Sequence, residues 1–167
     1  NCFHDSYYGF SHMESAGICQ SSGYIWYDNL SYYWLDPAKE QARDYIIDLA
    51  LECARLGFDE LLLQEVTYPS SGKLEKIDYS GNELDKVQAL TLFLTELREA
   101  LVPYDIGIAL LVVEDALLDW EEGTMAETTG QDMKQLLPLV DAVYVQTSDV
   151  EAAEAAVAGA APEKTPA

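Results

Sequence analysis

The chain is short of positive charge. It has nine Lys and Arg against thirty Asp and Glu, which gives a formal net charge of -21. A field of this sign repels phosphate backbones and anionic membrane surfaces, so we expect no nucleic-acid partner. Nine of the acids fall within residues 99–133, a stretch without Lys or Arg. That stretch is either a solvated acidic face, which is the commoner case, or a rim that attracts cations.

Long hydrophobic runs and clustered cysteines are also missing. No apolar run reaches the roughly 18 residues of a membrane helix, so we expect no membrane insertion. The chain begins at Asn1 without a segment resembling a signal peptide, and we expect further sequence upstream. Cys2, Cys19 and Cys53 are too far apart for a zinc or redox motif. Because phosphate loops, nucleophile elbows and clusters of metal ligands are absent too, we expect neither a metal nor another cofactor.

The residues that are present suffice for one domain, since the chain has 167 of them and 49% are hydrophobic. Ten of the eighteen aromatic residues lie in residues 1–35, among Gly, Ser and Asn, which predicts a loop-rich segment. Within it we expect residues 2–5 to close a strand and residues 24–27 to be extended. Asp36 and Pro37 then predict the N-cap and first residue of a helix. Gly57 is the expected left-handed cap at its end.

Strands and helices alternate through the rest of the chain. Continuous apolar character predicts a strand over 58–64 that is covered on both faces. The elements expected after it are a helix over 82–101, a strand over 106–113, a helix over 131–137, a strand over 140–145 and a last helix with a Ser148 to Glu151 capping box. This order predicts a parallel α/β fold, as a domain over 1–158 with a flexible tail over 159–167. The firmest part is 57–69, GFDELLLQEVTYP, where a helix, a strand and a loop meet.

Several motifs in the first 70 residues resemble those of one bacterial family, the glycoside hydrolase-like (β/α)8 barrel proteins. They are Trp34-Leu35-Asp36-Pro37, Arg43-Asp44-Tyr45-Ile46-Ile47, the 57–69 junction ending in Tyr68-Pro69, Phe3-His4-Asp5 and the spacing Ser22-Gly23…Trp26…Asp28. The resemblance implies a TIM barrel, a carbohydrate partner and a secreted protein, extracellular or at the bacterial cell surface. A closed barrel needs about 250 residues, so this chain supplies about half of one. The other half, or a second copy at exposed sheet edges, is the implied protein partner.

One departure from the family pattern bears on catalysis. The family has an acidic residue where this chain has Gln64, which Glu65 follows. A glutamine amide transfers no proton at neutral pH, so either the carboxylate role has moved to Glu65 or the site is inactive. Two functions therefore stay open, a glycoside hydrolase with paired carboxylates and a non-catalytic carbohydrate-binding barrel. A parallel α/β domain unrelated to sugars is a third.

Glycoside hydrolysis uses two carboxyl groups, about 5 Å apart for retention and about 6.5–9.5 Å apart for inversion. The candidates follow predicted strands: Asp5, Glu65, and Glu114 or Asp115. Each has a plainer interpretation. Strand alternation turns Glu65 toward the helices as a solvated carboxylate unless the strand has already ended. Glu114 and Asp115 suit the first turn of a helix.

The candidate substrate-binding residues are aromatic or lie at strand ends. Flat rings with a polar tip stack on the apolar face of a pyranose and bond its hydroxyls. The expected set is His4, Trp26, Gln64, Tyr68 and Trp34. Trp26 is the best single candidate for a ring that faces a sugar. The competing interpretation is a loop packed by its own aromatic residues, with His4 satisfied by local backbone.

Overall fold

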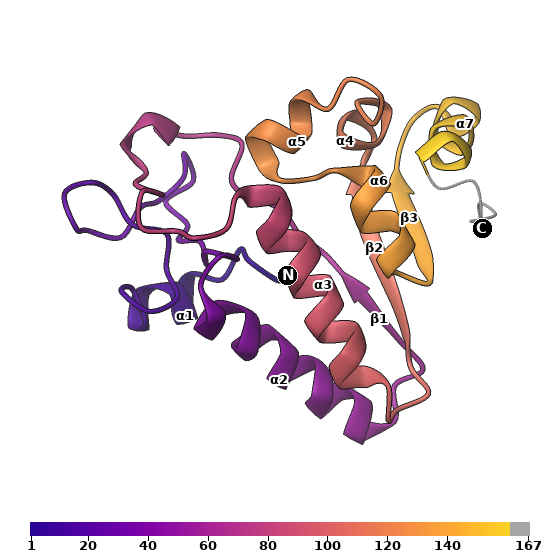
Figure 1. Cartoon of the computed structure of the whole chain (residues 1–167), viewed down its shortest axis with the longest axis horizontal. Helices are drawn as coiled ribbons and strands as arrows, with labels where there is room; N and C mark the ends of the chain where they lie inside the picture. Colours follow the sequence, from indigo (N-terminus) through magenta and orange to yellow (C-terminus); the bar gives the residue numbers. More distant parts are fainter. Residues whose placement is uncertain (161–167) are drawn as a thin grey trace.

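The computed structural model describes residues 1–160 as a parallel sheet with helices between its strands (Figure 1). The helices are α1 (Ser6–Ser11), α2 (Glu40–Leu56), α3 (Lys86–Leu101), α4 (Glu114–Leu118), α5 (Thr124–Thr129), α6 (Met133–Leu136) and α7 (Val150–Ala160). The strands are β1 (Glu60–Leu63), β2 (Gly107–Val113) and β3 (Ala142–Gln146). Two 3-10 turns, η1 (Leu74–Lys76) and η2 (Leu137–Leu139), complete the elements.

The sheet has the sequential order β1-β2-β3, and both pairs of neighbours are parallel. Leu62 pairs with Ala109, and Ala109 pairs in turn with Ala142. A helical connection precedes each new strand, as parallel pairing requires. The predicted parallel α/β fold is therefore confirmed as an α/β chain with a three-stranded parallel sheet.

Helices α2 and α3 lie side by side across one face of the sheet (Figure 1). In α3 the apolar side chains recur at helical spacing, and six of them are buried: Ala89, Leu90, Phe93, Leu94, Leu97 and Leu101. Asp85 and Gln88 form a capping box at its start. Gly57 ends α2 at φ 86°, a left-handed conformation that glycine adopts without strain, as predicted. Arg43 of α2 pairs with Glu96 of α3 at 2.7 Å.

Several predicted helix starts are wrong by one to four residues. Helix α2 begins at Glu40, not after Asp36, whose carboxylate accepts from Tyr68 and Asn82. Helix α3 begins at Lys86, four residues after the predicted Asn82. At α7 the Asp149 carboxylate accepts from the Ala152 N–H at 3.1 Å, so Asp149 replaces Ser148 as the cap. The α7 helix continues through Ala160, and residues 161–167 of the predicted tail lie outside the described residues.

The N-terminal segment adjoins β1 without being a regular strand. The Cys2 N–H donates to the Gln64 carbonyl at 2.8 Å, and the Phe3 N–H donates to the Glu65 carbonyl at 3.3 Å. Two bonds are too few for the predicted strand over 2–5, but they continue the sheet beyond the end of β1. The extended piece expected over 24–27 appears as isolated antiparallel bridges, Cys19 to Ile25 and Tyr27 to Tyr33.

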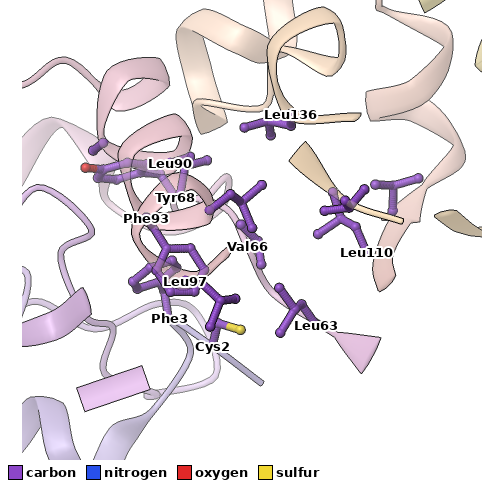
Figure 2. Packing of buried hydrophobic residues seen from close by; sticks show 14 of the residues in the cluster. Cys2, Phe3, Leu63, Val66, Tyr68, Leu90, Phe93, Leu97, Leu110 and Leu136 are labelled. Carbon is purple, nitrogen blue, oxygen red and sulfur yellow. The ribbon is translucent and has the colours of Figure 1, made fainter. Parts of the chain in front are cut away.

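The core lies between the sheet and α3 (Figure 2). The Phe3 ring packs edge-on against Phe93, with ring centroids 4.9 Å apart. Cys2 beside it is buried, and burial raises the pKa of its thiol to about 12. Leu63 and Leu110 pack from β1 and β2. The first residues of the chain are thus anchored in the core.

The two faces of the sheet differ. Leu63 and Leu110, which are paired in register, are buried under the helices. The opposite face carries Leu62, Val113 and Tyr144, which are 44%, 50% and 46% exposed. Within the described residues, β1 is therefore covered on one face, and the prediction of a strand covered on both is wrong. Also among the described residues, no helix is long and apolar enough to cross a membrane.

Candidate functional site at the carboxyl end of the sheet

The candidate residues His4, Gln64, Glu65 and Glu114 all lie where chain segments leave the carboxyl end of the sheet. β1 ends at Leu63 and β2 ends at Val113. The loops that follow these strands lie at the same end of the molecule as the starts of α2 and α3 (Figure 1). In parallel α/β proteins this end is where ligands bind.

His4 is held between aromatic rings. It stacks on Trp34 with centroids 4.5 Å apart and an interplanar angle of 16°, and Tyr32 meets it edge-on at 5.0 Å. Its side chain is 21% exposed. Its Nε2 is buried without a hydrogen-bond partner among residues 1–160. The expectation that local backbone satisfies His4 is therefore wrong for Nε2, which faces the Asp28 carboxylate instead.

The carboxylate that faces His4 is Asp28, and sequence reasoning gave Asp28 no role. Asp28 Oδ2 lies 3.7 Å from His4 Nε2 and accepts from the Trp34 indole at 3.1 Å. Its Oδ1 accepts from the backbone of Leu30 and Tyr32. Burial opposes ionisation of Asp28, but these hydrogen bonds outweigh it and hold the pKa below its usual value. Asp28 is thus an anion fixed beside His4. Its place before the short turn Asn29-Leu30-Ser31 was the available sequence signal.

Asp5, the first candidate acid, is engaged in the fold. One oxygen accepts from the Tyr8 N–H at 2.8 Å and so caps α1, and the other accepts from the Tyr45 hydroxyl at 3.1 Å. Burial, followed by the charge of Asp5, raises the pKa of Tyr45. Both oxygens of Asp5 are therefore occupied by donors within the fold.

Glu65 sits at a sharp bend just after β1. Its φ is 55°, a left-handed value that is uncommon for a residue other than glycine and often marks a functional turn. Its side chain is exposed. The strand has already ended at Leu63, so the alternation that would have turned Glu65 toward the helices does not apply. Gln64, half-buried beside it, keeps the alternation of Leu62 and so belongs to the uncovered face.

Glu114 and Asp115 are the first two residues of α4, which is the plainer of the two expectations for them. Glu114 also accepts from the Ser148 N–H at 3.3 Å, so it links the ends of β2 and β3. Asp115 is exposed. Glu114 remains at the carboxyl end of the sheet, with one oxygen contacting the chain after β3.

Three predicted sugar-binding aromatics are buried. Trp26 is 1% exposed and donates its indole N–H to the Lys73 carbonyl at 3.0 Å, so most of its ring is packed within the fold. Trp34 is buried against His4 and Asp28. Tyr68 is 1% exposed. For these rings the loop packed by its own aromatics is the better description.

A buried polar cluster around Asp36 was also missed. Asp36 accepts from the Tyr68 hydroxyl at 3.1 Å and the Asn82 amide at 2.9 Å. Lys86 lies over the rings of Tyr68 and Tyr79 and donates to the Thr128 carbonyl. Burial lowers the pKa of Lys86, against the charge of Asp36. An open hollow of about 840 Å³ beside Tyr79 and Lys86 adjoins this cluster. The cluster holds the loop after β1 against α2 and α3.

No group of three or more His, Cys, Asp or Glu within residues 1–160 is placed to hold a metal ion. The side chains at the carboxyl end of the sheet are an imidazole, an amide and two carboxylates that are exposed or half-buried.

Comparison with known proteins identifies the family to which the chain belongs. No curated protein matches the sequence significantly. The crystal structure of a hypothetical protein from Ruminiclostridium thermocellum ATCC 27405 is similar, with 25% sequence identity and a TM-score of 0.56. The match covers 64% of this chain and 54% of that one, so the chain spans about half the length of that protein. Residues 1–147 match the family described as "Putative glycosyl hydrolase domain", and the chain therefore belongs to that glycosyl hydrolase-like family.

Proposed function

We propose that this chain is part of a (β/α)8 barrel that binds and hydrolyses a glycan at the carboxyl end of its sheet. Glu65 and Glu114 are the proposed reacting carboxylates, and His4 is a proposed sugar-binding residue. The observation that carries the proposal is the His4 ring at the carboxyl end of the sheet, which stacks on Trp34 beside Asp28 and is 21% exposed.

The barrel is supported by the arrangement of the sheet. Its three parallel strands follow one another in sequence order, as they do in a barrel. Parallel sheets are normally covered on both faces, whereas Leu62, Val113 and Tyr144 are about half exposed. In a closed barrel these side chains would fill the interior with those of further strands.

The proposed reaction needs one carboxyl group to protonate the oxygen of the leaving sugar and another to attack the anomeric carbon or activate water. Glu65 suits such a role because it is exposed on a left-handed turn at a strand end. Glu114 occupies the corresponding place after β2. His4 would contribute hydrogen bonds to sugar hydroxyls, oriented by its contacts with Trp34 and Asp28.

The test is hydrolysis of a panel of oligosaccharides by this chain and by any longer polypeptide that contains it. We expect Glu65→Gln and Glu114→Gln each to lower kcat by about 10²–10⁴, the usual contribution of a general acid or base. Asp115→Asn is the matched control, because Asp115 is an exposed acid next to Glu114. Undiminished turnover in both glutamate variants would remove these assignments.

One observation favours a second function, glycan binding without hydrolysis. Gln64 stands where the resembling family has an acid, and the Asp5 carboxylate is occupied by the Tyr8 N–H and the Tyr45 hydroxyl. Under this alternative the wild type binds glycans without turnover, and Gln64→Glu gains hydrolytic activity by supplying the missing carboxyl. A wild type that hydrolyses glycans would exclude it.

A further inference from the structure

Two lysine side chains line a small pocket beside the candidate site. It has a volume of about 200 Å³ and lies between the N-terminal loop and the loop after β1. Gln20, Tyr27, Asn29 and Ser31 line it from the first loop, and Lys73 and Lys76 line it from the second. The aromatic ring of Tyr27 is about half exposed. The pocket thus combines amides, a hydroxyl, an open aromatic ring and two ammonium groups.

Its walls are fixed to one another. Trp26, which also lines the pocket, donates to the Lys73 carbonyl at 3.0 Å, and the Ser21 N–H donates to the Lys76 carbonyl at 3.2 Å. Gly72 has φ 105°, and a Cβ there would lie 2.9 Å from the Trp26 ring. Glycine lets the second loop close onto the first. The pocket is therefore built by tertiary contacts.

The two lysines differ from most other cations in the described chain. Arg43 and Arg98 pair with carboxylates, and Lys39 and Lys86 donate to carbonyl groups. Lys73 and Lys76 form no ion pair with any of residues 1–160, although the chain has thirty acids. Their charge is available to a ligand.

Asp28 also lines the pocket, but its carboxylate is already bound. Oδ1 accepts from Leu30 and Tyr32, and Oδ2 accepts from the Trp34 indole and lies 3.7 Å from His4. Asp28 stays ionised, but its oxygens face these donors, and with Lys73 and Lys76 the pocket keeps one net positive charge. Asp28 connects the pocket to the His4 site, so a ligand in one lies next to the other.

We propose that this pocket binds one carboxylate-bearing sugar unit, a uronate, of the glycan. The Lys73 and Lys76 ammonium groups would pair with its carboxylate. The Gln20 and Asn29 amides would bond its hydroxyls, and the Tyr27 ring would cover its apolar face. The inference rests on the proposed function and adds the substrate class, an acidic polysaccharide. Because the net charge of -21 repels anions at long range, affinity must come from these short-range contacts.

The test is calorimetric titration with a glucuronate-containing oligosaccharide and with its carboxyl-reduced neutral counterpart. We expect the uronate to bind at least about tenfold more tightly, which corresponds to about 1.4 kcal/mol. Lys73→Gln combined with Lys76→Gln should abolish that preference, because the two ammonium groups that pair with the carboxylate are removed. Lys134→Gln, an exposed lysine away from the pocket, is the control. Circular dichroism checks that each variant folds.

Equal affinity for the two sugars, or an unchanged preference in the double variant, would overturn the uronate site. So would displacement of the uronate by an equal concentration of inorganic sulfate, which would indicate general anion binding. In these cases binding of the neutral sugar leaves the proposed function standing. If neither sugar binds and the glycan panel shows no binding or hydrolysis, the proposed function fails together with the inference.

Discussion

The Tyr68 hydroxyl donates a hydrogen bond to Asp36 Oδ1 at 3.1 Å, across 32 positions of the sequence. Both side chains are buried, and the Asn82 amide satisfies the other carboxylate oxygen. Burial, then the Asp36 charge, raises the pKa of Tyr68 well above its usual value. This contact fixes the loop that carries Glu65 relative to the start of α2.

We predict that Tyr68→Phe lowers the free energy of unfolding at pH 7 by about 1–3 kcal/mol, because a buried carboxylate loses a donor. The folded pKa of Tyr68 is raised, so its contribution is complete below the unfolded value near 10 and declines as pH rises further. Urea unfolding at pH 7 and at pH 10.5 measures the difference, which should shrink at the higher pH. Tyr104→Phe is the control, and an equal loss there would contradict the account.

Asp28 gives the opposite pH dependence. Its pKa is lowered in the folded chain, so its stabilising effect is present above the unfolded value near 3.9 and is lost as pH falls below it. Asp28→Asn should therefore destabilise the chain by about 1–3 kcal/mol at pH 6.5 and by less at pH 3. Denaturant unfolding at both values is the measurement. A difference that grows toward acid would show that the sign is wrong.

Arg43 holds three parts of the chain together. It donates to the carbonyl groups of Pro37 and Ala38 and pairs with Glu96. We predict that Arg43→Lys costs about 1–3 kcal/mol, because an ammonium cannot reproduce the planar fork of the guanidinium. Arg55→Lys, at an exposed position of the same helix, should change stability little. Equal thermal unfolding midpoints for the two variants would refute the structural role of Arg43.

The uncovered face of the sheet should make the isolated chain self-associate, since an exposed apolar face and open strand edges favour pairing. Sedimentation velocity of the wild type should show a dimer or larger species. Leu62→Glu with Val113→Glu should shift it toward monomer. Val102→Glu tests a residue that is exposed outside the sheet and should have no such effect. A wild type that stays monomeric at high concentration would contradict the claim that the uncovered face of the sheet packs against further polypeptide.

Local sequence patterns predicted the helices and strands, and long-range contacts explain most of the predictions that were wrong. Repeating apolar residues predicted α2 and α3, and Gly57 marked the end of α2. The start of α2 was misplaced because Asp36 forms a turn onto the Ala38 N–H and also bonds Tyr68 and Asn82, so the helix begins only at Glu40. Trp26 was taken for a sugar-facing ring because its burial depends on the later loop at Gly72. Helix α1 has no apolar period to reveal it, and Asp5 caps it.

The same contrast between local patterns and long-range contacts applies to the candidate site residues. The strand ends predicted the place of Glu65 and Glu114, because parallel strands finish at one end of a sheet. The contact between His4 and Asp28 was not predictable from local patterns, because the two residues lie far apart in the sequence. It requires the turn after Asp28 to fold back onto the first residues of the chain.

The most direct test of the central claim, that a glycan binds beside His4 at the carboxyl end of the sheet, is the nuclear magnetic resonance spectrum of the histidine rings. The chain has two histidines, and His12 stacks on Tyr8 away from Asp28, so it serves as an internal reference. On titration with the oligosaccharides, we predict that the His4 ring resonances move with saturation while those of His12 stay in place. Glycan binding that leaves His4 unchanged, or no binding by any glycan, would contradict the account.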